Sequence, residues 1–323
     1  MNMQRFRNIL VLIQDGHATE ALRARAAWLA QANGARLTLA HCLADTEGEL
    51  SRLLALLPGN GGAQARSDLD AQKRAELDAV AAPLRAEGHD VQIALLAGTP
   101  FIETIRYVLK HDIDMVLTEA QHSLASPFFR SNEMHLLRKC PCPVWILNAR
   151  SEAKSNCIVA AVDPDPFDVP RDALNRQVLE MATSLAAQDK ARLDVLHAWH
   201  LPEERTLRSA LVNAPDSNID MLLDHAERLS AERLNALIEA HGPDLPPDRV
   251  IHVKGQPSDM ILQHVEAEAA DTLVMGTVGR TGIAGFFIGN TAETVLSRAQ
   301  CSVLAVKPQG FVSPVTLTPQ EDE

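Results

Sequence analysis

Several features that would assign a function directly are absent from this 323-residue sequence. Aromatic residues make up only 4% of the chain, so a packed core must be built mainly from aliphatic side chains and alanine. No apolar run approaches the roughly 20 residues that a membrane-spanning helix needs, and the first residues lack the apolar segment of a signal peptide. The five cysteines, an odd number at irregular spacing, argue against a disulfide framework. We therefore expect a reduced, cytoplasmic protein with no membrane partner.

Motifs for common catalytic chemistry are missing as well. The sequence has no G-x4-G-K-[ST] P-loop, no H-E-x-x-H motif and no recognisable pairing of a nucleophile with a base. The formal net charge of −12 disfavours binding to nucleic acid, because like charges repel. We expect a protein that is not an enzyme and that holds any anionic ligand locally, through backbone N–H groups or a few basic side chains.

The most informative stretch is a glycine-rich segment between an apolar run and a helical pattern. The run Thr272–Met275 is short enough to be a buried strand. Asn290 is a good helix N-cap, and Glu293 three residues later can complete a capping box. Glycine lets a ligand approach backbone N–H groups closely, and a helix N-terminus adds unpaired donors and a positive dipole end. The order strand, glycine-rich loop, helix therefore predicts a seat for phosphate groups.

The spacing of these glycines is more specific than their number. Gly276, Gly279 and Gly289 form G-x2-G-x9-G, followed by the polar residues Asn290 and Thr291. The stretch resembles the nucleotide-binding signature of the universal stress protein family, although that family has Ser or Thr where this chain has Asn290. Without a ligand, the same stretch would be a glycine-rich surface loop.

The chain also contains an internal repeat. In the first half, five apolar segments with strand character alternate with helical patterns, at residues 8–13, 37–41, 91–96, 115–118 and 143–147. The same order returns from residue 158, and matching features such as His41 and His197 recur about 150–160 residues apart. This alternation predicts an α/β fold with a doubly wound parallel sheet in each half. The expected domains are residues 1–150 and 155–308, followed by a flexible acidic tail at 309–323.

The repeat also predicts where a ligand would bind. If each sheet reverses its direction of growth after the third strand, strands one and four become neighbours. Their carboxyl ends then form the crevice where ligands bind in such sheets. In the second half these ends are Asp163 and Gly276.

The resemblance to universal stress proteins covers almost the whole chain as two copies, and it is strongest for tandem members of the E-type. It is carried by His135–Trp145, Gly276–Ile283 and Gly289–Glu293. It implies a five-stranded sheet of order 3-2-1-4-5 in each half and a role as a stress-response sensor or regulatory module. It further implies that ATP or a related adenine nucleotide binds in the second half. The residues that it assigns to the nucleotide are Asp163 at the nucleoside, then Gly276, Gly279, Gly289, Asn290 and Thr291 at the ribose and phosphates, with Arg280 as a charge-assisted contact.

The first half departs from this pattern. No glycine occurs between Glu119 and Cys142, and Glu119 puts negative charge where phosphate would sit. Asp15 survives after the first strand, but its loop partner is missing. We expect the first half to be a degenerate copy that binds no nucleotide.

The fifth strand of each half should lie at the edge of its sheet. Pro143–Leu147 and Ser302–Val306 are strongly apolar, and an exposed apolar edge invites aggregation. We therefore expect the two halves to pack as a pseudo-dimer in which these strands pair or cover one another. Whether two whole chains also form a homodimer stays open.

Other residues allow a functional and a structural interpretation. Cys140 and Cys142 could suggest metal or redox chemistry, but structural thiols are favoured, because no second ligand pair is present. His41 and His197 are expected to be hydrogen-bonded structural residues. Asp163 and Asp165 could be magnesium ligands, or turn and cap residues.

Two alternatives to nucleotide binding remain open at this point. One is a carrier or sensor of an apolar ligand, with a cavity under segments 43–57 and 201–223. The other is a slow nucleotide hydrolase. The leucines that form an apolar helical stripe in the first of these segments, for which core or interface packing is expected, are Leu50, Leu53, Leu54 and Leu57.

Overall fold

The chain folds into two consecutive sets of five strands. The strands of the first half are β1 (Asn8–Leu12), β2 (Arg36–Ala44), β3 (Val91–Gly98), β4 (Met115–Glu119) and β5 (Val144–Leu147). Those of the second half are β6 (Cys157–Ala161), β7 (Arg192–Trp199), β8 (Val250–Lys254), β9 (Thr272–Gly276) and β10 (Ser302–Val306). The structure is a computed structural model that describes residues 6–14, 17–44, 49–120, 131–148, 152–165, 168–201, 204, 206, 216–242, 244–277 and 288–317.

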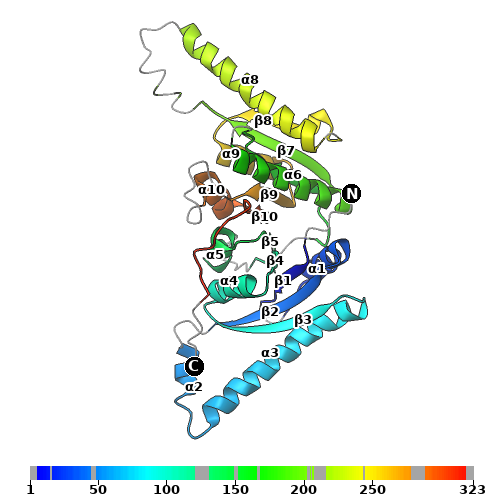
Figure 1. The fold of residues 1–323 in the computed structure, drawn as a ribbon, viewed down its shortest axis with the longest axis vertical. Helices are drawn as coiled ribbons and strands as arrows, with labels where there is room; N and C mark the ends of the chain where they lie inside the picture. The colour runs from blue at the N-terminus through cyan, green and yellow to red at the C-terminus, as the bar shows by residue number, and fades with distance from the viewer. Residues whose placement is uncertain are drawn as a thin grey trace.

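All ten strands join into one continuous sheet of order β3-β2-β1-β4-β5-β10-β9-β6-β7-β8 (Figure 1). Within each half the neighbours are parallel and follow the predicted order 3-2-1-4-5. Where the halves meet, β5 and β10 are antiparallel, with Leu304 opposite Trp145 and Ala305 opposite Val144. The predicted pairing of the two apolar edge strands is confirmed, so neither apolar edge is exposed.

Helices cover both faces of this sheet. The helices of the first half are α1 (Glu20–Asn33), α2 (Glu49–Leu54), α3 (Gly61–Ala86), α4 (Pro100–Lys110) and α5 (Ser131–Lys139). Those of the second half are α6 (Val169–Asp189), α8 (Asp216–His241), α9 (Pro257–Ala267) and α10 (Asn290–Arg298), with a short 3-10 helix η2 (Pro247–Arg249). The core residues of α1, α3, α6 and α8 gather on one face, and those of α4, α5, α9 and α10 on the other.

Alternation along each strand divides the core between these faces. In β1, Ile9 and Val11 join the cluster under α1 and α6, whereas Leu10 and Leu12 join the cluster under α5 and α10. All four side chains are buried. Strands buried on both faces in this way read as continuous apolar runs, which is why the sequence pattern identified them.

Local sequence sets the ends of the helices. The Oγ1 of Thr19 accepts a hydrogen bond from the Leu22 N–H at 3.2 Å, which caps the start of α1. Gly34 ends that helix in the left-handed conformation, with φ of 63°, as predicted. In the second half, Asp168 caps α6 through the Arg171 N–H.

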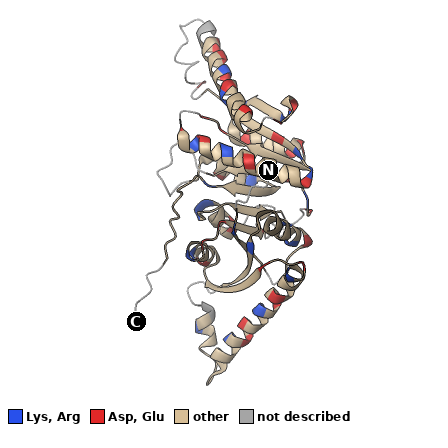
Figure 2. Ribbon diagram, turned by 45° about the vertical axis from the view of Figure 1, so that its right-hand side comes forward, with Lys and Arg blue, Asp and Glu red and all other residues tan. Residues whose placement is uncertain are grey.

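Two long helices project beyond the sheet. Helices α3 and α8 each run for 26 residues. Helices α3 and α8 extend away from opposite ends of the sheet (Figure 1). Acidic and basic residues are mixed along both helices (Figure 2), as expected of surfaces that face water.

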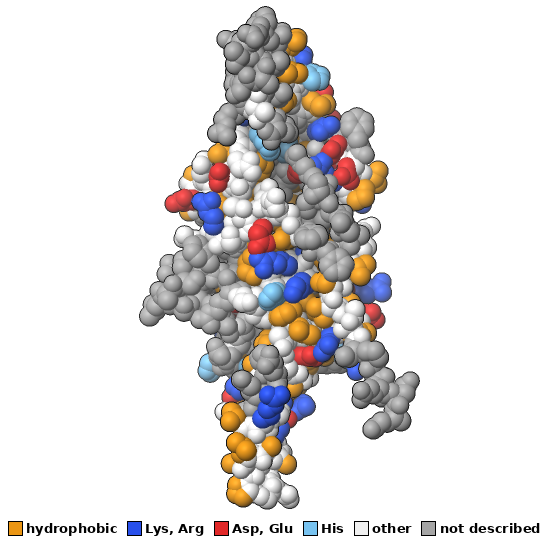
Figure 3. Space-filling model, turned by 90° about the vertical axis from the view of Figure 1, so that its left-hand side faces the viewer, with side chains coloured by type: hydrophobic (Ala, Val, Ile, Leu, Met, Phe, Trp, Pro, Cys, Tyr) orange, Lys and Arg blue, Asp and Glu red, His pale blue; other side chains and the backbone are white. Residues whose placement is uncertain are grey.

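Within the described part of the leucine stripe, Leu53 and Leu57 do not pack in the core. Leu53 is 64% exposed and Leu57 is 44% exposed, and neighbouring Leu56 is 80% exposed. Helix α2 lies beside α3 at one end of the molecule, beyond the sheet, so its outer side chains have no strand to cover (Figure 1). Apolar side chains are visible at this end in Figure 3.

The chain after β10 returns to the first half. Ser313 is buried, Val315 packs against the core under α4 and α5, and the Thr316 carbonyl accepts a hydrogen bond from Arg106 Nε at 3.3 Å. The expected flexible tail at 309–323 therefore begins with a segment, 309–317, that lies along the first half. Residues 318–323 lie outside the described part of the chain.

Candidate functional site

The predicted crevice lies where the second sheet reverses its direction of growth. Strands β6 and β9 are parallel neighbours, with Ala161 opposite Met275, so their carboxyl ends lie side by side. Asp163 follows the first strand and Gly276 ends the second. The topology thus brings the acid and the start of the glycine-rich loop to the same edge of the sheet, where the sequence predicts a crevice.

The two ends of the glycine-rich loop are joined by a hydrogen bond. The Gly289 N–H donates to the Thr277 carbonyl at 3.0 Å, and α10 begins immediately afterwards. Helix α10 therefore starts beside the carboxyl end of β9. Gly279 and Arg280, which the sequence places in this loop, lie outside the described residues.

The start of α10 differs from the prediction in one respect. The N-cap is Gly289, in extended conformation, and Asn290 is the first helical residue. Glu293 does not complete a capping box with Asn290, because its carboxylate binds the guanidinium of Arg138 in the first half. A glycine N-cap has no side chain to satisfy the first N–H groups of the helix, which include those of Asn290 and Thr291. These donors and the helix dipole favour an anion.

Gly276 has a packing role that the sequence did not reveal. A Cβ added at this position would lie 2.7 Å from Cδ2 of Leu174 in α6. The absence of a side chain therefore lets α6 approach the end of β9 closely. Helix–strand packing therefore explains the glycine at position 276 as well as the close approach of a ligand does.

Asp163 is held by α6. Its carboxylate accepts from Arg171 Nη2 at 3.0 Å, and its backbone N–H and carbonyl each bond the Asn175 side-chain amide at 2.8 Å. The Asp163 side chain is 44% exposed, so it is also within reach of a ligand.

The same arginine bears on both interpretations of the Asp163–Asp165 pair. Arg171 Nη1 donates to Asp165 at 2.7 Å, so one guanidinium bridges both carboxylates. A cation that already sits between the two acids does not suit a magnesium site built from them. Among the described residues, no group of three or more metal-ligating side chains is found.

Lys307 is a residue of this region that sequence reasoning missed. Its Nζ donates to Thr277 Oγ1 and to the Leu137 carbonyl, both at 2.6 Å, and to the Arg138 carbonyl at 3.2 Å. Burial of this side chain lowers the pKa of Lys307 to about 8, although the nearby thiols of Cys140 and Cys142 oppose the shift. The lysine thus connects the start of the glycine-rich loop to the C-terminal end of α5. The sequence feature that could have pointed to Lys307 is its position directly after a fully apolar strand.

The crevice of the first half contains a carboxylate. Glu119, at the end of β4, accepts hydrogen bonds from the N–H and the Oγ1 of Thr19, at the start of α1. Burial raises the pKa of Glu119, and the Thr19 N–H partly offsets this. Gln14 donates to the Glu119 carbonyl at 3.1 Å and so draws the end of β1 toward the end of β4. Asp15 lies outside the described residues. An acid therefore occupies the N-terminus of α1, where a phosphate would otherwise find donors.

The histidines and cysteines have structural environments. His41 Nδ1 lies 2.9 Å from the Ile13 carbonyl, and His197 Nδ1 lies 3.0 Å from the Val162 carbonyl, so each ties its second strand to the end of the first. The expected hydrogen-bonded role of both histidines is confirmed. Cys140 and Cys142 are buried, with their sulfur atoms 3.5 Å apart. Both thiols are thus shielded from water, as structural cysteines are.

Comparison with known proteins agrees with this architecture. The model of the universal stress protein family matches twice, over residues 5–148 and 158–307. A protein of Photorhabdus laumondii named universal stress protein E is 28% identical over 97% of this chain and 98% of its own length. The Escherichia coli K12 protein of the same name is 28% identical over 99% of this chain and its full length.

Solved structures share the fold. A Pseudomonas aeruginosa protein of unknown function superposes with a TM-score of 0.69, at 23% identity and 94% coverage of both chains. A universal stress protein from Archaeoglobus fulgidus has a TM-score of 0.57 at 17% identity, covering 93% of this chain and 98% of its own. In the described parts of the present chain, every helix is too short or too polar to cross a bilayer.

Proposed function

Because this chain belongs to the universal stress protein family, we propose that it is a stress-response regulatory module that binds ATP or a related adenine nucleotide in its second half. The observation that carries this proposal is the difference between the two crevices. In the first half, β4 ends at the carboxylate of Glu119, which accepts hydrogen bonds from Thr19. In the second half, β9 ends at Gly276 and leads into the G-x2-G-x9-G loop, and a glycine N-cap leaves the first donors of α10 without a side-chain partner.

The nucleotide would contact both sides of this crevice. The half-exposed Asp163 would face the nucleoside, and the N–H groups of Asn290 and Thr291 would face the phosphates, with Gly289 leaving room for their approach. Gly279 and Arg280 of the loop complete this proposed set. Magnesium would enter with the phosphates, since Arg171 already bridges the two acids that could otherwise hold it.

Calorimetric titration with ATP tests this assignment. Gly279→Val should weaken ATP binding at least about tenfold, because a branched side chain blocks the approach of a phosphate to the backbone. The matched control in the other half is Glu119→Gln, which keeps the side-chain shape and should leave ATP affinity unchanged. Equal affinity of wild type and Gly279→Val, with both folded by circular dichroism, would refute the site assignment.

We also propose that the protein turns over nucleotide very slowly or not at all. Phosphoryl transfer needs positioned charge on the moving group and an oriented nucleophile. The proposed site offers backbone donors and one arginine, Arg280. Phosphate release from ATP and Mg²⁺ should therefore stay far below about 1 per second, an ordinary enzyme rate. A magnesium-dependent rate at or above that level, lost in Gly279→Val, would make this protein a hydrolase.

A further inference from the structure

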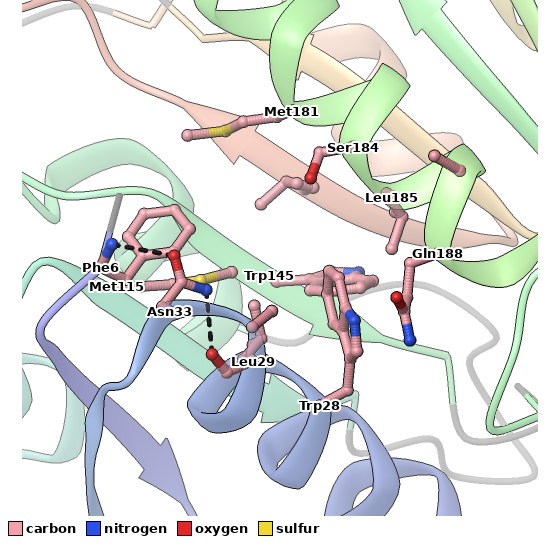
Figure 4. Close-up of a pocket in the computed structure, with 13 residues that line it drawn as sticks. Phe6, Trp28, Leu29, Asn33, Met115, Trp145, Met181, Ser184, Leu185 and Gln188 are labelled. Atoms are coloured by element: carbon pink, nitrogen blue, oxygen red, sulfur yellow. Dashed lines mark hydrogen bonds between the residues drawn. The ribbon is translucent and has the colours of Figure 1, made fainter. Parts of the chain in front are cut away.

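A pocket of about 240 Å³ lies at the junction of the two halves, away from the proposed nucleotide crevice. Its walls come from α1 of the first half and α6 of the second, and its floor from the paired strands β5 and β10 (Figure 4). The large apolar side chains that line it include Trp28, Leu29, Trp145, Met181, Leu185 and Leu304. None of its lining residues is charged.

Two side chains that line this pocket carry buried hydrogen-bond donors with no acceptor among the described residues. The indole N–H groups of Trp28 and Trp145 are both buried, and neither donates a hydrogen bond to any described group. A buried tryptophan N–H usually finds a partner, and leaving one unpaired costs about 1–3 kcal/mol. Figure 4 shows the two indoles next to each other, at the side of the pocket toward Gln188. Two such donors side by side need an explanation.

The surroundings of Trp145 indicate what charge a ligand should carry. The guanidinium of Arg25 lies 5.1 Å from the centre of the Trp145 ring. This arginine already has a counter-ion, because it donates to Asp189 at 2.8 Å within the same junction. Its charge is therefore neutralised, and the pocket does not favour an anion.

We infer that this junction pocket binds a small neutral aromatic molecule of one or two rings that carries a hydrogen-bond acceptor such as a carbonyl oxygen. The size follows from the volume, since a dry cavity of about 150 Å³ holds benzene and this pocket offers about 240 Å³. The aromatic character follows from the indole walls and from Met115 and Met181, whose sulfur atoms pack well on rings. The acceptor follows from the two unpaired N–H groups.

Such a ligand would bridge the halves. Trp28 and Leu29 belong to the first half, whereas Met181 and Leu185 belong to the second. A molecule held between them stabilises the docked arrangement by its binding free energy. The pocket therefore gives the tandem chain a ligand-dependent junction that one half alone could not form.

The indole N–H groups themselves report binding. The chain has three tryptophans, and the third, Trp199, does not line the pocket. The measurement is an NMR titration of the full chain, labelled with ¹⁵N-tryptophan, with the probe coumarin. Coumarin should shift the indole N–H signals of Trp28 and Trp145 downfield until binding saturates. The signal of Trp199 should not move. Naphthalene, of similar size but without an acceptor, should bind more weakly and give no downfield hydrogen-bond shift. Absence of saturable shifts with coumarin, or equal shifts with both probes, would overturn the inference.

Paired variants distinguish a specific effect on ligand binding in the pocket from a general effect on protein stability. Ala32→Leu adds volume inside the pocket and should weaken coumarin at least tenfold, whereas Ala71→Leu, on the exposed face of α3, should not change its affinity. Trp28→Phe keeps an aromatic wall and removes one donor, so coumarin should weaken at least fivefold and naphthalene less than twofold. Unchanged coumarin affinity in Ala32→Leu would place binding elsewhere, and equal losses for both probes in Trp28→Phe would remove the role of the acceptor.

Discussion

A buried lysine at the junction shows how much one side chain can depend on both halves. Lys307 is only 4% exposed, and two of its three acceptors are the carbonyls of Leu137 and Arg138, in the last turn of α5. A cation is favoured at a helix C-terminus, where unpaired carbonyls and the negative end of the dipole meet. The third acceptor, Thr277 Oγ1, begins the glycine-rich loop. Lys307 therefore holds the loop of the second half against a helix of the first.

Its titration predicts a defined dependence of stability on pH. The pKa of Lys307 is lowered from 10.5 to about 8 in the folded protein, mainly by burial. Between these values the unfolded chain binds more protons than the native state, so this group makes stability rise with pH. Well below pH 8, Lys307 is protonated in both the folded and the unfolded state, so its contribution to the free energy of unfolding no longer changes with pH. The free energy of unfolding of wild type, minus that of Lys307→Met, should therefore increase by about 2–3 kcal/mol between pH 8 and pH 10.5.

Urea denaturation across this pH range measures that difference. Taking the difference between the two proteins cancels the cysteines that do not interact with Lys307, such as Cys301, whose pKa is raised to about 12 by burial. A pH-independent difference would show that Lys307 keeps its ordinary pKa in the folded state.

At the scale of elements, the β5–β10 pair is the seam of the sheet. Leu304 is 4% exposed and lies opposite Trp145, so Leu304→Asp would bury a charge without a partner. We expect this substitution to cost on the order of 3–5 kcal/mol and to loosen the docking of the halves. The same change at Leu53, which is 64% exposed on α2, should stay within about 0.5 kcal/mol. Denaturant unfolding and the radius of gyration from solution scattering measure both effects.

Equal results for the two variants would contradict this prediction. If Leu304→Asp and Leu53→Asp had equal stability and equal radii of gyration, the β5–β10 seam would not hold the halves together in solution.

The elements also show why sequence reasoning succeeded at some positions and failed at others. Strands such as β1 and β10 were predictable because a strand buried on both faces is apolar throughout. The start of α10 was missed by one residue, because Asn290 has the better capping side chain while the Thr277 carbonyl fixes Gly289 in place. The leucines near α2 have a core-like pattern, but periodicity does not reveal that this helix lies beyond the sheet.

The candidate site was likewise predictable from the sequence only in part. The positions of Asp163 and Gly276 on either side of one crevice followed from strand order, which short right-handed crossovers constrain strongly. The partners of these residues did not follow. Arg171 binds Asp163 from the next helix, and Lys307 reaches Thr277 from the end of β10. Such contacts depend on the direction of side chains in three dimensions, which the spacing of residues along the sequence does not indicate.

At the scale of the whole molecule, the two halves share buried polar groups as well as a sheet. Arg25 of α1 donates to Asp189 at the end of α6, and both side chains are almost completely buried. Ser155 joins them, because its Oγ accepts from Arg25 at 3.2 Å and its N–H donates to Asp189 at 2.8 Å. A second ion pair between the halves, Arg138 with Glu293, is about one-third exposed. Among the described residues, these two ion pairs join the halves and differ mainly in burial.

This pair of contacts permits a matched test of what couples the halves. Arg25→Met leaves the Asp189 carboxylate buried without its cation, which should cost about 3–5 kcal/mol in the free energy of unfolding. Arg138→Met removes the exposed pair by the same substitution and should cost at most about 1 kcal/mol. The double variant Arg25→Met with Asp189→Asn removes the stranded charge and keeps an acceptor for the Ser155 N–H. It should therefore be more stable than Arg25→Met alone, although it has lost both members of the ion pair. Urea denaturation of the four proteins gives these values, and equal costs for Arg25→Met and Arg138→Met would show that the buried network does not hold the halves together.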